Sequence, residues 1–525
     1  MKKILSLLVA LMLALSAACL AESSVDALTI AVTKDENSLT PFTYVSSTGT
    51  VVNRLIYDTL FIADLDNNIV PWMVEDDYEV ADGYTRYTFT LLEGQKFHDG
   101  TPLTTADVAF SFTYPGAQNV SSQRKICAKI ERIDIADDRT MTINLSAPDI
   151  NFLRDGLATM RIISKAQYEN VEDATTVHET LGSGMYRLKE YKVGQYYILE
   201  AVEDYFKGAP RVKTLNMPIM EDATAVQTGL LSGELAAATS SIGVEMLDVF
   251  RSNPDIEVFA SAGYAPMIMN INNGVAPLND PAFRTALTYA VDVNGIMNTL
   301  YGEYATVGTK GTIRPDLPYS VAGLEYVYDV DRANSILDEA GYGQRNADGV
   351  RLTPEGEPCS FEILVYSGST IRIRAAELTA HQLELAGIAL TVKVMEMDTV
   401  DAYVWPDFEV SKGRDYDFAM WGWGSSISPE FLVNLYSSDF SVGTFNVCGY
   451  VNADVDAVIA EQYAAAATDG ELNAALMEIQ NRIAEDPGLI CFGYADSLQA
   501  CNVGQYAGFK SGKGTNVINV YSFLD

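Results

Sequence analysis

The residues best suited to binding a small molecule lie in one short segment. Met420-Trp421-Gly422-Trp423-Gly424-Ser425-Ser426 sets two indole rings among residues with small side chains or none. Indole faces supply apolar contact or stacking, and glycine lets a second backbone come close. The alternative is a buried strand whose tryptophans belong to the core. We predict ligand contacts at Trp421, Gly422, Trp423, Gly424 and Ser425.

A second group of candidates consists of asparagines. Asn270, Asn272 and Asn273 follow the strand-like segment Ala265–Met269. An amide donates and accepts hydrogen bonds, which suits a ligand contact at Asn270 and Asn272. The same amides could instead satisfy the backbone of a turn, and the sequence leaves both roles open.

No pattern of catalytic residues accompanies these candidates. The sequence lacks the GxSxG, HExxH and GxxxxGK[ST] motifs, and its three histidines, at positions 98, 178 and 381, lie in unrelated contexts. We therefore predict no catalytic residue and no enzyme. Because the chain contains 70 acidic residues, a carboxylate pair of the glycosidase kind can always be chosen, and a secreted glycoside hydrolase stays a remote alternative.

One stretch has part of a calcium-binding pattern. Asp64, Asp66, Asn68 and Glu75 occupy positions 1, 3, 5 and 12 of an EF-hand loop, but Ile69 stands where that loop requires glycine. A polar hairpin turn is the better interpretation. The six cysteines include no CxxC pair, so a zinc or redox centre has no support. We predict no metal and no cofactor.

The N-terminus has the features of an export signal. Two lysines precede the apolar run Ile4–Ala18, which at 15 residues is too short to span a bilayer comfortably. Ser16-Ala17-Ala18-Cys19 resembles a bacterial lipobox, in which Cys19 would carry a lipid anchor. Ordinary cleavage of a signal peptide, residues 1–21, is the alternative. The protein is expected in the periplasm or at the cell surface, tethered to the membrane if Cys19 is lipidated.

The composition limits the partners. The formal net charge of −35 at pH 7 repels nucleic-acid phosphates, so no nucleic acid is expected. Export permits disulfides, and Cys491 and Cys501 could join neighbouring strands near the C-terminus.

The elements that must position the candidates are mixed α/β. Tyr87, Phe89 and Leu91 alternate with threonines as a half-buried strand, and Asp99-Gly100 predicts a tight turn. Thr104 or Thr105 can then cap a helix with Asp107 in its first turn. Farther along the chain, Gly182-Ser183-Gly184-Met185-Tyr186-Arg187-Leu188 predicts the start of a hairpin that Tyr196–Val202 continues.

A second compositional unit begins near residue 264. Asp280 is expected to cap a helix with Pro281 at its first position, and Asp331 to start another. A third helix ends at Gly387 and is followed directly by the alternating segment 390–394. Helix, glycine and strand in this order indicate the αβ unit of a parallel sheet. The sequence alone thus predicts a mixed α/β chain of several domains.

Several phrases in order resemble one family. YTRYTFTLLEGQKFHDGTPLTTADVAFSF, the Gly-rich hairpin with Tyr205-Phe206-Lys207-Gly208-Ala209-Pro210, Ser232-Gly233-Glu234, PAFRTALTYAVDVNGI, YDVDRANSILDEAGY and ELAGIALTVKV are similar to the family-five solute-binding proteins of ABC importers. That group includes oligopeptide, dipeptide and nickel receptors. The resemblance runs from roughly residue 28 to residue 503.

The resemblance implies a fold. It is α/β, the two-lobed periplasmic-binding-protein fold (type II, cluster C-like) with an extra mixed α+β subdomain in the first lobe. Carried over, lobe I comprises residues 26–43, 179–262 and 491–525, and the extra subdomain comprises residues 44–178. Lobe II is then residues 263–490. We call these parts lobe I, the extra subdomain and lobe II.

The resemblance also implies a function. The chain would capture a small solute, first of all an oligopeptide, by closing its lobes, and would deliver it as a monomer to an ABC permease. An oligosaccharide or a nickel chelate is the alternative cargo. In peptide-binding relatives the segment that matches Trp421–Ser425 pairs with the ligand main chain, and an Asp four residues before the following Pro grips the α-ammonium. Here that position is Ser425, so either an acid of the loop Asp35-Glu36-Asn37-Ser38 serves or the ligand lacks the ammonium. We accordingly include Glu36 and Asn37 among the predicted contacts.

Overall fold

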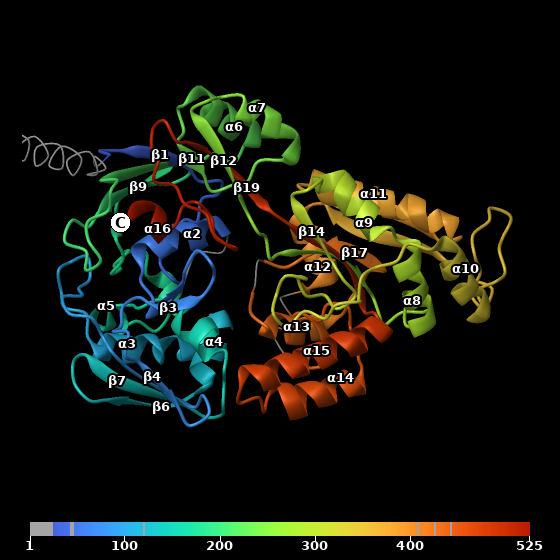
Figure 1. Ribbon diagram of the computed structural model, residues 1–525, viewed down its shortest axis with the longest axis horizontal. Helices are drawn as coiled ribbons and strands as arrows, with labels where there is room; N and C mark the ends of the chain where they lie inside the picture. The colour runs from blue at the N-terminus through green and yellow to red at the C-terminus, as the bar shows by residue number, and fades with distance from the viewer. Residues whose placement is uncertain (1–24, 43–46, 119–120, 407–408, 425–426, 441–443) are drawn as a thin grey trace, which may run out of the picture.

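The computed structural model describes residues 25–42, 47–118, 121–406, 409–424, 427–440 and 444–525. The predicted signal segment, with Cys19, lies outside the described residues, and lipidation stays a prediction. Within the described ranges, no helix combines the length and the apolar character needed to cross a bilayer. Two bodies lie side by side in Figure 1, and extended segments connect them at one end.

The first body is built on a five-stranded mixed sheet with the order β11-β1-β10-β9-β8. β1 pairs in parallel with β10 and β11, and the hairpin predicted after Gly182 is confirmed as the antiparallel pair β8–β9. Helices α6 and α7 pack on this sheet through apolar side chains that include Val226 and Phe250. The bounds are β1 Leu28–Ala31, β8 Tyr186–Lys192, β9 Tyr196–Ala201, β10 Thr214–Pro218, α6 Ala223–Ser232, β11 Ala237–Ala238, η4 Val244–Met246, α7 Leu247–Arg251 and α16 Val520–Phe523.

The extra subdomain carries an antiparallel sheet with the order β4-β5-β7-β6 and a small hairpin, β2–β3. The predicted strand at Tyr87 is β5, and the predicted capped helix is α3. Its N-cap is Thr104, whose backbone N–H donates to Asp107 at 3.0 Å. The bounds are α2 Ser47–Ile56, β2 Phe61–Ala63, β3 Ile69–Pro71, β4 Glu79–Ala81, β5 Arg86–Thr90, α3 Thr105–Ser111, η1 Tyr114–Ala117, α4 Ser121–Ala128, β6 Ile130–Ile135, β7 Thr140–Leu145, η2 Leu153–Leu157, α5 Lys165–Tyr168 and η3 Ala174–Thr176.

The second body is built on a six-stranded mixed sheet with the order β14-β18-β13-β17-β15-β16. The predicted αβ unit is confirmed, because α11 is followed by β16, which pairs in parallel with β15. Asp280 caps α8 with Pro281 at its first position as predicted, whereas α10 is capped by Asp329 and begins before Asp331. The bounds are β13 Pro266–Ile271, α8 Pro281–Ala290, α9 Val293–Tyr301, β14 Ala305–Val307, α10 Val330–Glu339, β15 Ser360–Tyr366, α11 Thr370–Leu385, β16 Ala389–Met395, α12 Met397–Val404, η6 Val410–Lys412, β17 Phe418–Trp421, α13 Glu430–Tyr436, α14 Ala453–Val458, η7 Ile459–Tyr463, α15 Asp469–Glu485 and β18 Leu489–Ala495.

Two chain segments cross between the bodies. β12 (Ile256–Ser261) and β19 (Ser497–Asn502) pair antiparallel beside the first body, and they continue into β13 and β18 of the second. Gly263 lies against the other crossing segment, where a Cβ would come within 1.9 Å of the Ala495 carbonyl oxygen. A side chain at residue 263 would therefore force the two segments apart. Short paired connections of this kind suit a hinge.

Each body has its own apolar interior. In the first body one cluster joins the five-stranded sheet to the sheet of the extra subdomain. In the second body, Met267 and Met269 of β13 enter the cluster on one face of the sheet, and Ile268 enters the cluster on the other. The three larger sheets fall within the predicted lobe I, extra subdomain and lobe II, but the predicted limit at residues 490 and 491 would divide β18. The domain limits remain a proposal, with the crossing at Asp496 as the better boundary.

Candidate ligand-binding cavity between the lobes

A cavity of about 270 Å³ lies where the extra subdomain, the C-terminal segment and one loop of lobe II meet. Its walls come from α2, the β2–β3 hairpin, η2 and residues 513–521, and Ile427 and Ser428 supply the contribution of lobe II. Because lobe II supplies one side of the cavity and the first body supplies the rest, relative motion of the lobes would open or close it.

Polar contacts join the lobes beside this cavity. The Ser428 hydroxyl donates to Asp155 Oδ2 at 2.6 Å. Lys129 Nζ lies 2.8 Å from Asp149 in its own subdomain and 3.8 Å from Glu430 of α13 in lobe II. These contacts hold lobe II against the extra subdomain in the arrangement described.

Two carboxyl groups line the cavity, and they differ in role. Asp58 accepts hydrogen bonds from Tyr205 at 2.7 Å, from the Trp72 indole at 3.1 Å and from Ser183 at 3.0 Å, so its oxygens are occupied by the fold. Burial raises the pKa of Asp58, although these three hydrogen bonds act to lower it. Burial also raises the pKa of Asp155, to about 6, although the Ser428 hydroxyl opposes the shift. Asp155 is therefore a cavity group whose charge changes near pH 6.

The predicted tryptophan segment forms an aromatic cluster in lobe II. Trp423 stacks on Phe445 with ring centroids 4.2 Å apart, and Trp421 and Trp405 meet it edge-on at 4.6 and 4.9 Å. Trp421 Nε1 donates to Asp401 at 3.0 Å, which anchors that ring in the core. The Trp423 side chain is buried, yet its Nε1 has no hydrogen-bond partner among the described residues. A donor left in this state is suited to a ligand acceptor.

The two predicted glycines lie in different surroundings. A Cβ on Gly422 would lie 2.9 Å from the Pro266 carbonyl oxygen, so the backbone that approaches there belongs to β13. A Cβ on Gly424 would meet nothing within 4 Å among the described atoms. Gly424 is thus the position with room for another backbone. Ser425 lies outside the described residues, and ligand contact at these positions remains a prediction.

The predicted asparagines are used within the fold. Asn270 is fully buried, and its amide donates to the carbonyl oxygens of Ala419 and Trp421 at 3.3 and 3.0 Å. Asn272 donates to the carbonyl oxygens of Arg414 and Tyr416. The second role that the sequence left open, satisfying backbone groups, is therefore the one these amides perform here. Both residues would influence a ligand by positioning the chain that leads into Trp421.

The loop after β1 is also committed to local contacts. Glu36 is buried and its carboxylate accepts the N–H of Gly49 at 3.1 Å, near the start of α2. Asn37 is exposed in a turn with φ of 57°. Asp35 accepts from Tyr191 and Tyr197 at 2.8 and 2.7 Å, with N–H donors nearby. Neither Glu36 nor Asn37 lines the cavity, so a ligand role for them remains a prediction that the cavity itself does not support.

Sequence reasoning missed most of the residues that line the cavity. They are single polar, charged or aromatic side chains on separate elements, and no motif connects them in the sequence. Only the position of Ser428, directly before the proline used to align the tryptophan segment, offered a signal. The missed residues are Arg54, Asp58, Trp72, Arg154, Asp155, Arg161, Ser428, Lys513 and Tyr521.

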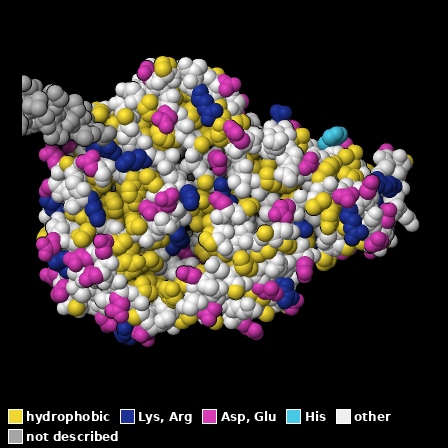
Figure 2. Space-filling view, viewed as in Figure 1, with side chains coloured by type: hydrophobic (Ala, Val, Ile, Leu, Met, Phe, Trp, Pro, Cys, Tyr) yellow, Lys and Arg dark blue, Asp and Glu magenta, His cyan; other side chains and the backbone are white. Residues whose placement is uncertain are grey.

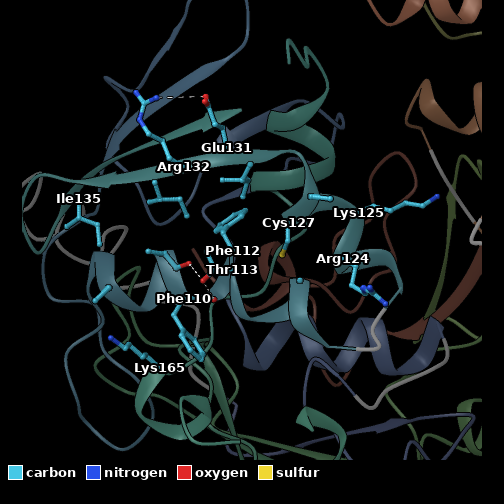
Figure 3. A pocket seen from close by; sticks show the side chains of 16 residues that line it. Phe110, Phe112, Thr113, Arg124, Lys125, Cys127, Glu131, Arg132, Ile135 and Lys165 are labelled. Atoms are coloured by element: carbon cyan, nitrogen blue, oxygen red, sulfur yellow. Dashed lines mark hydrogen bonds and ion pairs between the residues drawn. The ribbon is translucent and has the colours of Figure 1, made fainter. Parts of the chain in front are cut away.

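A wider hollow of about 1090 Å³ lies within the extra subdomain alone, between α3, α4 and β6. Its lining is mainly apolar, and Phe110, Phe112 and Cys127 are among the residues that Figure 3 labels around it. The side chains of Arg124 and Lys125 point away from its interior. Because a single subdomain supplies its walls, lobe movement would not enclose a ligand there.

The polar turn at residues 64–68 is a hairpin turn and not a calcium loop. Asp64 Oδ1 accepts the backbone N–H groups of Asp66 and Asn68 at 2.9 and 2.8 Å, which closes the β2–β3 hairpin. In the part of the chain that the structure describes, no three His, Cys, Asp or Glu side chains gather as metal ligands. Cys491 and Cys501 are both free thiols and lie in different sheets, so the bridge considered between them is wrong.

Comparisons with known proteins agree on one family. The model of bacterial extracellular solute-binding proteins, family 5 Middle, matches residues 68–443. The oligopeptide-binding protein AppA of Bacillus subtilis (strain 168) is 26% identical over 422 residues, 78% of this chain and 75% of that protein. The nickel-binding periplasmic protein of Escherichia coli (strain K12) is 25% identical over 395 residues, 72% of each chain. The structure of AppA in complex with a nonapeptide has a TM-score of 0.80 at 21% identity, and the match covers 96% of this chain and 99% of that one.

Two α/β lobes, a double crossing and a cavity at their junction define the class as a two-lobed solute-binding protein. The chain belongs to family 5 of the bacterial extracellular solute-binding proteins, the substrate-binding proteins of ABC transporters. This is a family of binding proteins and not of enzymes. The resemblance and the fold predicted from the sequence are thereby confirmed.

Proposed function

We propose that this protein captures a small solute, first of all an oligopeptide, between its lobes and delivers it to the permease of an ABC importer. The observation that carries the proposal is the interlobe cavity, whose walls come from lobe I, the extra subdomain and lobe II. A ligand that touches both lobes selects the closed arrangement, and the permease would read that closed surface. The protein would act outside the cytoplasmic membrane, released or tethered through Cys19.

Two features favour a peptide. Gly424 has room for a second backbone, and the unpartnered Trp423 Nε1 can donate to a carbonyl oxygen. Pairing with main-chain atoms common to all peptides gives affinity without demanding one sequence. Among the relatives, AppA is named for oligopeptide binding.

An oligosaccharide and a nickel chelate are the alternative cargoes. The partly buried Phe445 ring offers an aromatic surface of the kind that sugars prefer, and one relative is named for nickel binding. A glycoside hydrolase is set aside, because the family consists of binding proteins.

Thermal shift and small-angle scattering test the proposal. Purified mature protein would be screened with tripeptides to octapeptides, with xylo-oligosaccharides and with nickel–histidine. We expect peptides to raise the unfolding temperature and reduce the radius of gyration, and Trp423→Leu to weaken binding. Tyr328→Leu, at an exposed aromatic residue of lobe II, is the matched control and should bind as the parent does.

Three outcomes would count against parts of the proposal. If saccharides or nickel–histidine bind and peptides do not, the proposed oligopeptide cargo would be wrong, and the proposed receptor role would stand. A cargo recovered in chemically altered form would overturn the receptor role. Binding without any change in the scattering profile would overturn lobe closure.

A further inference from the structure

Four cationic side chains line the interlobe cavity. Arg54 comes from α2, Arg154 from η2, Arg161 from the segment after η2, and Lys513 from the C-terminal segment. Among the described residues of these walls, two carry carboxyl groups, Asp58 and Asp155. The chain as a whole carries twice as many acidic as basic residues, 70 against 35, so this local excess of positive charge reverses the general balance.

The surface of the molecule carries many acidic side chains. Figure 2 shows Asp and Glu side chains spread over both bodies on the face it presents. The excess of positive side chains in the cavity lining is therefore opposite in sign to the charge of the rest of the surface. In a space with low-dielectric walls, charges of one sign reinforce each other and attract the opposite charge.

The cavity carboxylates do not neutralise all of these cations. Asp58 directs its oxygens to Tyr205, Trp72 and Ser183, and Asp155 is held by the Ser428 hydroxyl.

Among the described residues, neither Arg154 nor Lys513 makes an ion pair with a carboxylate. Their charge remains available to a ligand.

Neutral acceptors hold two of the guanidinium groups and the main chain of Lys513 in place. Arg154 donates to the side chain and the carbonyl oxygen of Asn67, at 3.2 and 2.9 Å, in the β2–β3 turn. The backbone N–H of Lys513 donates to the Leu65 carbonyl oxygen in the same turn at 2.8 Å, which places the main chain of Lys513 and not its ammonium group. Arg161 Nε donates to Asn53 Oδ1 at 3.0 Å. Neutral partners fix the direction of a guanidinium without cancelling its charge, so the site is organised before a ligand arrives.

We propose that the cargo carries an oxyanion, a carboxylate or phosphate group beyond any main-chain terminus, which these cations bind in the cavity. The inference rests on the proposed function and narrows it to acidic solutes. Arginine presents its N–H donors in a fixed fork that matches carboxylate and phosphate oxygens, and charge-assisted bonds of this type are the strong ones. An acidic peptide, a phosphopeptide and a uronic-acid oligosaccharide all present this chemistry.

Calorimetry with charge-matched pairs tests the inference and distinguishes the sources. The pairs are Ala-Glu-Ala with Ala-Gln-Ala, Ala-phosphoserine-Ala with Ala-Ser-Ala, and trigalacturonate with galactotriose. In at least one pair, we expect the acidic member to bind about tenfold more tightly or better, as one charge-assisted hydrogen bond predicts. Its advantage should shrink as the ionic strength rises.

Variants connect the preference to the cavity. In Arg154→Gln and in Lys513→Gln we expect the advantage of the acidic ligand over its matched neutral ligand to fall to within about twofold. Lys513 is exposed, so this variant keeps the fold even if Arg154→Gln is less stable. Arg332→Gln is the control: it removes an exposed arginine of α10 on lobe II that does not line the cavity. This variant should keep the full preference for the acidic ligand.

The outcomes separate the inference from the function on which it rests. Equal binding of acidic and neutral partners in every pair, with normal closure, would overturn the inference alone. An acidic preference that persists in the Arg154→Gln/Lys513→Gln double variant would overturn the assignment to this cavity. If no peptide, saccharide or chelate binds at all, the proposed function fails and the inference fails with it.

Discussion

The contact between Asp155 and Ser428 gives the protein a measurable response to pH. Burial raises the pKa of Asp155 to about 6 while lobe II covers it, and the Ser428 hydroxyl donates to it at 2.6 Å. Lys129, Asp149 and Glu430 also face this carboxyl group. Opening the lobes would return Asp155 to water and its pKa towards the ordinary value of 3.8. Asp155→Asn keeps a similar shape and a hydrogen-bond acceptor but removes the titration.

The direction follows from proton linkage. An acid with a raised pKa in the closed form binds its proton more tightly there than in the open form, so closure is disfavoured when the carboxyl is ionised. The cost is present above about pH 6 and disappears as the pH falls through that value. A pKa shift from 3.8 to about 6 corresponds to about 3 kcal/mol at its limit. Between about pH 7 and about pH 5 the expected gain in ligand affinity is about tenfold.

Calorimetry with Ala-Gln-Ala, together with scattering of the ligand-free protein, measures this effect. The parent should bind more tightly and become more compact as the pH is lowered from about 7 to about 5, and Asp155→Asn should show a flat profile. Asp348→Asn, which removes an exposed acid from a surface turn, should follow the parent. Equal pH profiles for the parent and Asp155→Asn would refute the reasoning.

Three further predictions concern stability and thiol chemistry. Asn270→Ala should lower the free energy of unfolding by about 2 kcal/mol, because it leaves buried carbonyl oxygens of β17 unsatisfied; an unchanged denaturant midpoint would contradict this. Burial lowers the pKa of His98 from its ordinary value of 6.5 to about 4, so the folded protein holds this ring in its neutral form. The free energy of unfolding should therefore be highest above pH 6.5 and should fall by about 2 kcal/mol by about pH 5. His98→Gln should remove that part of the acid sensitivity, and an identical loss in both proteins would exclude this origin. In the native protein a thiol reagent should modify Cys127 alone or no cysteine, since the other described cysteines are buried. In the denatured protein all of these thiols should react. Fewer reactive thiols than cysteines after denaturation would indicate a disulfide.

Local features of the fold were predictable because they depend on neighbouring residues. The alternation around Tyr87, the cap at Thr104 and the cap at Asp280 are decided within a few positions, and each appears as expected. The start of α10 shows the limit of such reasoning. Asp331 was expected to start this helix, whereas Asp329 caps it, because both aspartates are suitable caps and the local sequence does not distinguish them.

The candidate site divides in the same way. The segment around Trp423 was found because two aromatic rings among glycines are unusual in any sequence. Asn270 has the same donors and acceptors whether it faces a ligand or the neighbouring strand, so its use by β17 could not be read from its type.

By itself, the sequence determined that this is a mixed α/β protein of several domains with the phrases of one binding-protein family and no catalytic motif. Only the tertiary structure decided that Arg154, Lys513 and Ser428 share one cavity. The physical reason is separation along the chain: Arg154 and Lys513 meet because both are held by the β2–β3 turn of the first body, and the crossing at β12–β19 and β13–β18 brings Ser428 of lobe II to them. No local pattern in the sequence encodes that meeting. The charge of the cavity is therefore a property of the folded first body, and lobe II closes the cavity with uncharged residues.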